Sequence, residues 1–193
     1  NVSKIKTSIK LGVICPNSYE NDFYNFLVKL NSHSDVKFNI EYVIPFPGFN
    51  NAFKTPLNIP TISSQEWVNI AADQFTTPIT FGDILARKLD QLSALSVDVI
   101  LIYIPKEYEY FTSENDEDVS FDLHDYIKAY AAQKQIATQF IREKTIDSNL
   151  ICQVLWAISL AIYVKSNRTP WLVSNTRTET DFDGIGYSVK KYK

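Results

Sequence analysis

Short apolar runs that alternate with amphipathic helical patterns constrain the fold of this chain more than any other feature of its sequence. Leu11 to Cys15 (LGVIC) is apolar throughout, and Val97 to Ile104 (VDVILIYI) is nearly so. Such runs are typical of strands that are buried on both faces of a parallel sheet. Between them, apolar residues recur at helical spacing over 22–30 and 84–95, which predicts helices that pack on the sheet.

The carboxyl-terminal half repeats this alternation. HDYIKAYAAQ (124–133) predicts a helix, IATQFI (136–141) a short strand, and NLICQVLWAISLAIYVK (149–165) a long buried helix. WLV and GIGYSV, within 171–189, are two more strand-like pieces. This order predicts parallel β-α-β units, and therefore a Rossmann-like, doubly wound α/β fold with a mainly parallel sheet and helices on both faces. Such sheets usually bind ligands at the carboxyl ends of their strands.

Three segments between these elements have less regular patterns. Phe38 to Phe46 predicts a further strand, which ends where prolines remove hydrogen-bond donors. The stretch from Pro45 to Pro60 is rich in Pro and Asn and predicts a long loop. The acidic run from Ser113 to Asp118 predicts a solvated surface loop. The sequence contains neither a GxGxxG nor a Walker motif, so neither a dinucleotide site nor a P-loop is indicated.

Charge and cysteine usage restrict the partners. The chain has 193 residues and a formal net charge of −3, whereas a protein that coats nucleic acid along its length normally shows a basic field. Any nucleic-acid contact is therefore expected to be local. Cys15 and Cys152 lie in separate apolar runs without His or Cys partners at metal-ligand spacing, and we expect two buried thiols in a reducing compartment. We recognise no signal peptide or membrane span and expect a cytoplasmic protein without a membrane partner.

Four side chains form a candidate anion pocket. His124 and Lys128 are one helical turn apart, so an imidazole and an ammonium share a helix face. Gln139 lies on the next predicted element and Lys165 ends the long helix, and a doubly wound fold can bring all four together. A terminal phosphate carries roughly −1.5 to −2 charges and several acceptor oxygens, which suit two cations and a neutral donor.

Each of these residues also has a simpler interpretation. An exposed His and Lys at this spacing are common surface residues, and Gln139 suits the end of a strand. Lys165 suits the last turn of a helix, where its charge opposes the negative end of the helix dipole. Spacing alone therefore leaves the pocket open.

Two segments together resemble the MID domain of prokaryotic Argonautes, most closely that of a short Argonaute. In FDLHDYIKAYAAQKQIATQFI (121–141), a His is followed four positions later by a Lys and then, after about a dozen positions, by a Gln in an ATQ context. LAIYVKSNRTPW (160–171) adds a late helical Lys before a Pro-Trp pair. The similarity covers nearly the whole chain and is strongest from Phe121 to Ser188.

The resemblance assigns roles to individual residues. It implies that His124 stacks on the first base of a guide strand and helps to fix its 5′-phosphate, while Lys128, Gln139 and Lys165 bind the phosphate oxygens. Arg168 lies where relatives often carry a Gly pair, and it either adds a phosphate contact or caps the helix. The first-base specificity loop is expected at Ser120, Phe121, Asp122 and Leu123. In many members a Mg²⁺ or Mn²⁺ ion bridges the phosphate; no side chain of this chain is assigned as a metal ligand or a catalytic residue.

The end of the chain resembles the first strand of the family's RNase H-like PIWI domain. We therefore divide the chain into a MID domain, 1–170, and the first strand or strands of a truncated PIWI domain, 171–193. Cutting members place a metal-binding Asp at the position of Gly186, and glycine cannot ligate a metal. The resemblance thus implies a non-catalytic guide-binding module of a prokaryotic immunity protein. Its partners would be a 5′-phosphorylated guide RNA or DNA, through it a target strand, the rest of PIWI, and an associated effector protein.

Two other functions stay open from the sequence. One is a small-molecule domain or enzyme acting on a phosphorylated metabolite, with His124 as acid or base beside Asp125 or Asp122. It lacks a nucleophile motif. The other is a scaffold that docks a protein through the stretch from Pro45 to Pro60.

Overall fold

The structure is a computed structural model that describes residues 7–36, 42–115 and 120–170. Its main sheet contains β1 (Ile9–Pro16), β2 (Leu57–Asn58), β3 (Trp67–Ile70), β4 (Val99–Ile104) and β7 (Thr138–Arg142). Its α-helices are α1 (Glu20–Lys29), α2 (Phe49–Phe53), α3 (Pro78–Ser93), α4 (Leu123–Gln133), α5 (Glu143–Ile146) and α6 (Ile151–Lys165). Three 3-10 helices, η1 (Asn17–Tyr19), η2 (Ala72–Gln74) and η3 (Lys106–Thr112), and a small hairpin of β5 (Ser113–Asn115) and β6 (Ser120–Asp122) complete the described elements.

All pairings within the main sheet are parallel. β1 pairs with β4 on one side, and β4 pairs in turn with β7. On its other side, β1 pairs with β2 near its start and with β3 near its end. The sheet order is therefore β2 or β3, then β1, β4 and β7. This topology confirms the predicted doubly wound, mainly parallel α/β fold.

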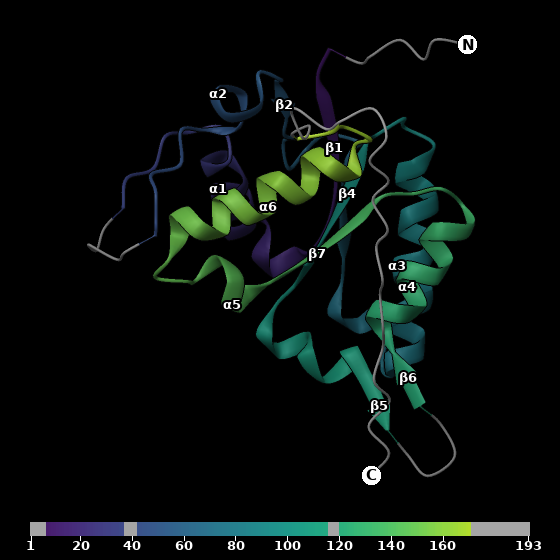
Figure 1. Cartoon of the computed structure of the whole chain (residues 1–193). Coiled ribbons are helices and arrows are strands. Elements are labelled where there is room, and N and C mark those ends of the chain that lie inside the picture. Colours follow the sequence, from purple (N-terminus) through teal and green to yellow (C-terminus); the bar gives the residue numbers. More distant parts are fainter. Residues whose placement is uncertain (1–6, 37–41, 116–119, 171–193) are drawn as a thin grey trace, which may run out of the picture.

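Helices cover both faces of the sheet, as Figure 1 shows. α1, α2 and α6 lie on one face and bury a core with alternate strand residues such as Leu11 and Leu101. α3 and α4 lie on the other face, over residues such as Ile14 and Ile102. β1 and β4 are buried on both faces because they are the central strands, which explains their continuous apolar runs.

The two helices α3 and α4 pack closely together. A Cβ atom on Gly82 of α3 would lie 3.0 Å from the ring of Tyr126 and 3.1 Å from Phe121. The Tyr126 hydroxyl donates a hydrogen bond of 2.8 Å to Asp83 of α3, which fixes the ring in this contact. At the start of α4, the Asp122 carboxylate accepts from the backbone N–H of Asp125 at 2.9 Å, which is an N-terminal cap. These contacts set the position of α4, which carries His124 and Lys128.

The segment between α1 and α3 departs from the sequence-based expectations. The strand predicted from Phe38 to Phe46 is wrong where the structure describes it: Tyr42 has a φ of 77° and is 91% exposed, and pairing is limited to one bridge between Ser34 and Phe46. Residues 38–41 lie outside the described residues. The long loop predicted from Pro45 to Pro60 contains the helix α2 and the strand β2. The edge strand β3 was not predicted at all.

The acidic surface run is also more ordered than predicted. Ser113 to Asn115 form β5, which pairs antiparallel with β6, so a loop is the wrong description of these three residues. Residues 116–118 of the run lie outside the described residues, as do the strand-like pieces at 171–189 and the proposed domain boundary. Cys15 and Cys152 are both free and buried, as predicted, and burial raises the pKa of the Cys15 thiol. In the described residues, no helix is long and apolar enough to cross a membrane.

Candidate phosphate-binding site

Two lysine ammonium groups meet at one backbone oxygen at the start of β7. The Nζ atoms of Lys128 and Lys165 donate to the carbonyl oxygen of Thr138 over 2.6 and 2.7 Å. Lys128 also donates to the Thr138 hydroxyl at 3.0 Å, and Lys165 to the amide oxygen of Gln139 at 2.5 Å. The structure thus brings together three of the four predicted phosphate ligands, from α4, β7 and α6.

The ammonium groups retain donor capacity for a further partner. An ammonium has three N–H donors. Each lysine uses two acceptors within the protein, so one donor remains on each. Neither lysine forms an ion pair with a carboxylate of the described ranges, unlike Lys10 and Lys134, which pair with Glu66 and Asp90 at 2.6 Å. The pair is therefore a positive centre that lacks an anionic partner in this part of the protein.

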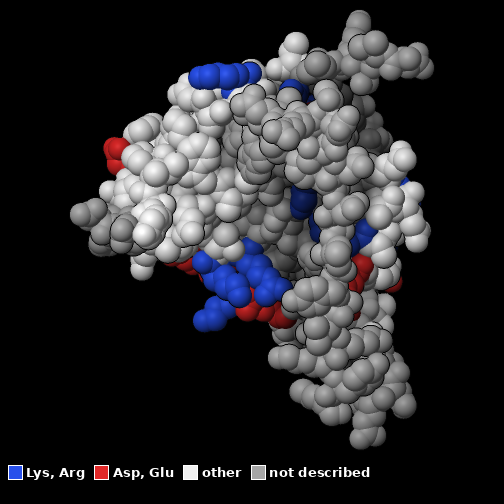
Figure 2. All heavy atoms as spheres, in the orientation of Figure 1, with Lys and Arg blue, Asp and Glu red and all other residues white. Residues whose placement is uncertain are grey.

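The electrostatic state of the pair agrees with this description. Burial, followed by the neighbouring charge of Lys128, lowers the pKa of Lys165 to about 8. Burial also lowers the pKa of Lys128. Both shifts show that positive charge is costly here, and a bound anion would relieve that cost. Figure 2 shows basic side chains set back in the recess beside α6, α4 and β7.

The site lies at the amino end of β7, since Thr138 is the first residue of that strand. Sheets of this kind usually bind ligands at the carboxyl ends of their strands, so the lysine pair lies at the opposite end from the expected ligand site. The geometry has a local cause. Lys165 ends α6 and Lys128 lies in the middle of α4, and the two helices flank β7 from opposite faces of the sheet. Their long side chains therefore meet at the amino end of β7, which is an edge strand.

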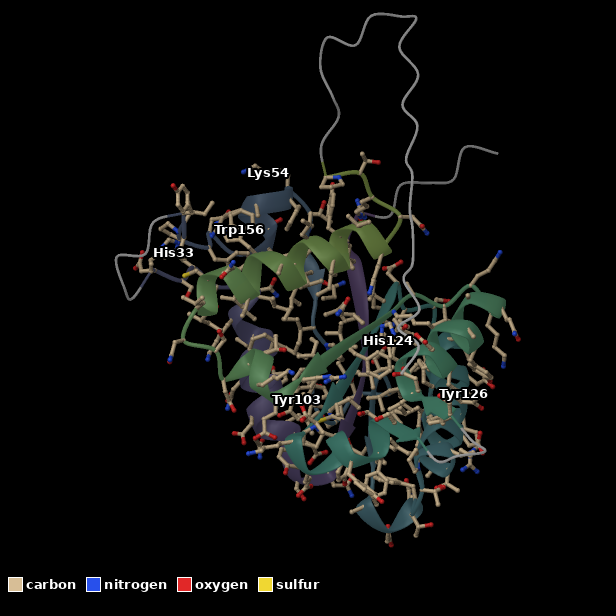
Figure 3. All side chains as sticks on the ribbon, turned by 60° about the horizontal axis from the view of Figure 1, so that its bottom comes forward. His33, Lys54, Tyr103, His124, Tyr126 and Trp156 are labelled. Atoms are coloured by element: carbon tan, nitrogen blue, oxygen red, sulfur yellow. The ribbon has the colours of Figure 1, made fainter. Side chains whose placement is uncertain are left out.

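His124 lies beside the lysine pair and does not join its hydrogen bonds. Its ring lies 5.6 Å from that of Phe140, between centroids, and its Nδ1 atom is 3.4 Å from an Asp125 carboxylate oxygen. The imidazole side chain is 58% exposed. Figure 3 shows His124 directed toward β7, whereas Tyr126 is directed toward α3. His124 and Lys128 thus share the β7-facing side of α4, as the spacing predicts, and the imidazole has an open face.

Two residues of the candidate site differ in how the structure places them. The amide of Gln139 accepts from Lys165 and donates to the carbonyl of Phe140 at 2.8 Å, so one amide N–H remains for a ligand. Arg168 lies over the ring of Tyr163, with its Cζ atom 5.9 Å from the centroid, and not at the Thr138 carbonyl. The structure therefore groups Gln139 with the lysines, and it places Arg168 over the Tyr163 ring near the end of α6.

The expected first-base loop is not a loop. Ser120, Phe121 and Asp122 form β6, and Leu123 begins α4 with its side chain 1% exposed. Ser120 and Asp122 are exposed, and Asp122 already caps α4. The segment leads directly into His124. The Leu123 side chain, however, packs in the hydrophobic core between the sheet and the helices α3 and α4.

Sequence reasoning missed Thr138, the residue that organises the site. Its side chain is 2% exposed, and its two oxygen atoms accept three hydrogen bonds from the lysines. In the sequence, the only feature that could have indicated a role for Thr138 is its position directly before Gln139, at the start of a predicted strand. A buried threonine is otherwise unremarkable in a strand.

The described residues do not fit a divalent cation at this centre. Mg²⁺ and Mn²⁺ prefer carboxylate, carbonyl and water oxygens. The oxygens of Thr138 and Gln139 already accept from the two ammonium groups, and no described carboxylate pairs with either lysine. A separate group, Asp122, His124 and Asp125, is close enough for a shared ion, but all three residues are exposed and Asp122 already caps α4. The donor set of the lysine pair suits an anion.

Comparisons with known proteins place this fold. No family model matches the sequence, and no curated protein is significantly similar to it. A crystal structure of Aa-Ago with externally bound siRNA matches 82% of this chain, with 19% sequence identity and a TM-score of 0.54. A structure of the Aquifex aeolicus Argonaute matches 86% of the chain, with 18% identity and a TM-score of 0.51. The chain has the fold of an Argonaute segment. It spans about a fifth of these Argonaute chains, 19% of one and 20% of the other.

Proposed function

We propose that this chain is a guide-binding module of the MID type, which anchors the 5′-phosphate and first nucleotide of a small guide strand. One observation carries the proposal: Lys128 and Lys165 converge on the Thr138 carbonyl, each with an unused N–H, and neither pairs with a described carboxylate. The Argonaute-like fold and the sequence resemblance support the same function.

A terminal phosphate fits this centre better than an internal phosphodiester does. A phosphodiester carries one negative charge, whereas a terminal phosphate carries about −1.5 to −2 and three strong acceptor oxygens near neutral pH. Two ammonium groups and the free amide N–H of Gln139 match that charge and that number of acceptors. His124, exposed and next to the lysines, is suited to stack on the first base.

The partners follow from this assignment. The primary ligand is a 5′-phosphorylated guide RNA or DNA, and a target strand would bind through that guide. One of the Argonautes that share the fold was solved with siRNA, which is consistent with nucleic acid as the ligand class. The remainder of a PIWI domain and an associated effector protein complete the proposed assembly. Mg²⁺ or Mn²⁺ would enter only with the phosphate, whose oxygens would have to supply the ligands that the described residues do not offer.

The module is proposed to be non-catalytic. Gly186, which stands where cutting relatives carry a metal-binding Asp, lies outside the described residues, so this part rests on the sequence. Incubation of the chain with a guide, a complementary target and Mg²⁺ or Mn²⁺ should leave the target intact. Guide-directed cutting that persists through repeated purification would show that the chain is an enzyme.

First-base selection is proposed to involve the segment that leads into His124. Because Leu123 is buried, an informative exchange replaces only Ser120 to Asp122 with the corresponding residues of another MID domain. The preferred first base should change while the dependence on a 5′-phosphate stays. An unchanged preference would remove this segment from base selection.

The function is tested by binding of matched strands. Short RNA and DNA oligonucleotides of one sequence, each with a 5′-phosphate or a 5′-hydroxyl, are titrated with the purified chain. For RNA, DNA or both, we expect the 5′-phosphorylated strand to bind at least tenfold more tightly than the 5′-hydroxyl strand of the same sequence. Equal binding of the two strands would contradict the proposal, and tight binding of a phosphorylated sugar but of neither strand would favour a metabolite-binding domain.

A further inference from the structure

Helix α3 carries two acidic residues, Asp83 and Asp90, and two basic residues, Arg87 and Lys88. Its acidic residues face α4, where the Asp83 carboxylate accepts from the Tyr126 hydroxyl at 2.8 Å. The Asp90 carboxylate accepts from the Tyr130 hydroxyl at 2.7 Å and from the Lys134 ammonium at 2.6 Å. The Asp90 carboxylate is thus paired with an ammonium, whereas Asp83 keeps its charge and accepts from a hydroxyl.

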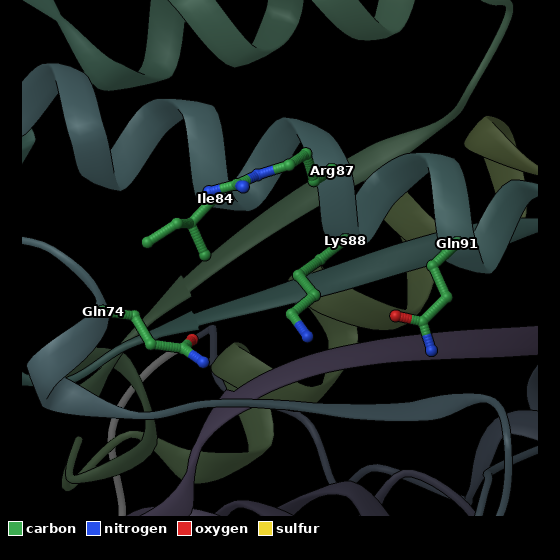
Figure 4. A pocket seen from close by; sticks show the side chains of 5 residues that line it. All are labelled: Gln74, Ile84, Arg87, Lys88 and Gln91. Atoms are coloured by element: carbon green, nitrogen blue, oxygen red, sulfur yellow. The ribbon is translucent and has the colours of Figure 1, made fainter.

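The basic residues of α3 line a cavity beside that contact, and Arg87 lies one helical turn from both Asp83 and Asp90. Ile84, Arg87, Lys88 and Gln91 lie at helical spacing on one face of α3, and with Gln74 of η2 they line a cavity of about 430 Å³. Figure 4 shows Lys88 and Gln91 extending from α3 over the strand beneath, the Arg87 side chain running along the helix toward Ile84, and Gln74 at the Ile84 end of the groove. We call this cavity the α3 groove. The residues that line it belong to the helix α3 and to η2, the 3-10 helix that follows β3.

The polar groups of the α3 groove are available to a ligand. In the described ranges, neither Arg87 nor Lys88 pairs with a carboxylate. The Gln74 amide oxygen accepts from the Ala71 N–H at 3.4 Å, which leaves its NH₂ group as a donor. The groove therefore presents a guanidinium, an ammonium and amide donors around the apolar side chain of Ile84.

We propose that the α3 groove binds the phosphodiester backbone of a single nucleic-acid strand. Arg, Lys and Gln are side chains that commonly contact phosphate and sugar oxygens, and Ile84, which is 4% exposed, forms only the floor of the groove. The chain as a whole carries a net charge of −3, so this positive groove is a local feature against a negative background.

The α3 groove is distinct from the lysine pair. The groove lies over the β3 side of the sheet, and the lysine pair lies at β7, the opposite edge. β1 and β4 separate these edges, and strands lie about 4.8 Å apart, so the edges are on the order of 14 Å apart. One phosphate cannot occupy both places. The groove is thus a second nucleic-acid contact, and it does not depend on a 5′-phosphate.

The test uses single-stranded RNA and DNA with a 5′-hydroxyl end, so that the lysine pair contributes little. The double variant Arg87→Gln and Lys88→Gln removes both charges and keeps residues with good helix propensity. Its affinity for these strands should fall about tenfold at low salt. The slope of log affinity against log salt should fall in magnitude by about 1.4, because each lost phosphate contact contributes roughly 0.7 for a single strand.

A matched control is Lys106→Gln with Lys144→Gln, two exposed lysines that follow the carboxyl ends of β4 and β7 and do not line the α3 groove. The control should keep the wild-type affinity and salt slope. The ratio of 5′-phosphate to 5′-hydroxyl affinity should be the same in the groove variant as in wild type. The test of the groove is therefore independent of whether the lysine pair binds the 5′-phosphate. The proposal is wrong if the control loses as much affinity as the groove variant, if the salt slope is unchanged, or if poly-glutamate competes as well as an oligonucleotide of equal charge.

Discussion

Lys128 and Lys165 donate hydrogen bonds to the same oxygen atom, the backbone carbonyl of Thr138, over 2.6 and 2.7 Å. Two positive groups that share one neutral acceptor repel each other, and this repulsion contributes to the lowered pKa of Lys165. The fold tolerates that arrangement because α4, β7 and α6 are fixed by the two cores on either side of the sheet. The two ammonium groups are therefore held close together at an electrostatic cost, which the proposed anion would relieve.

The affinity for a 5′-phosphorylated strand should depend on pH with a maximum between about 6 and 8. Below about pH 6 the phosphate gains a proton and loses charge. Above a pKa of about 8, Lys165 loses its proton, and affinity should fall by up to tenfold per pH unit. Titrations at pH 5.5, 7 and 9 measure this profile. A 5′-hydroxyl strand should show a flatter profile, and identical profiles for the two strands would contradict the role of Lys165.

The same lysine should make the ligand-free protein more stable as pH rises from 7 to 8.5. The pKa of Lys165 is about 8 when folded and near 10.4 when unfolded, so the unfolded chain binds more protons in this window and stability rises with pH. The gain is on the order of 0.5 kcal/mol, because solvent screens a half-buried group. Urea denaturation measures it.

Lys165→Met serves as the comparison for that experiment, since it removes the titrating group and keeps the length of the side chain. The variant should show a smaller rise in stability over the same pH range. Burial raises the pKa of Cys15, which has the opposite effect on stability above its unfolded pKa of about 8.5, so the window ends there. Equal slopes in wild type and Lys165→Met would show that Lys165 carries no strain.

Local sequence patterns predicted the parts of this fold that depend on local burial. β1 and β4 are buried along nearly their whole length, and their continuous apolar runs were a sufficient signal. α3 buries one face, which its helical periodicity indicated, whereas α6, predicted as a buried helix, leaves Ala157 and Val164 exposed. β2 has two residues and β3 has four, and each exists because β1 offers it an edge to pair with. The alternating residues near Tyr42 resembled a strand, but that residue has a positive φ and is exposed.

In the candidate site, too, the features that lie within one helix were predictable, and those that depend on packing between elements were not. The one-turn spacing of His124 and Lys128 fixed their common direction, because it is a property of a single helix. The meeting of Lys165 with Lys128 depends on how α6 and α4 flank β7, which no local pattern specifies. For the same reason Thr138 became recognisable as the shared acceptor only in three dimensions.

Gly82→Ala should destabilise the protein by about 1 kcal/mol. The new Cβ atom would lie 3.0 Å from the Tyr126 ring, which its hydrogen bond to Asp83 holds in place. Overpacking of this kind costs about 1–3 kcal/mol, and the better helix propensity of Ala returns up to about 1 kcal/mol. Thermal and urea denaturation measure the change. The new Cβ atom would also lie 3.1 Å from Phe121, so the same substitution should be neutral or stabilising in a background of Tyr126→Ala with Phe121→Ala. A loss of similar size there would show that these ring contacts are not the cause.

The most direct test of the central claim is a double-difference binding cycle at pH 7, with wild type and Lys128→Ala against 5′-phosphate and 5′-hydroxyl strands of one sequence. Lys144→Ala is the matched control because Lys144 is exposed on α5; Lys134 is unsuitable, since it pairs with Asp90 at 2.6 Å. A charge-assisted hydrogen bond contributes about 1.5–3 kcal/mol, so Lys128→Ala should weaken the phosphorylated strand about ten- to a hundredfold and leave the hydroxyl strand nearly unchanged. Lys144→Ala should bind both strands as wild type does. If Lys128→Ala weakens both strands equally, or weakens neither, the lysine pair does not hold the 5′-phosphate.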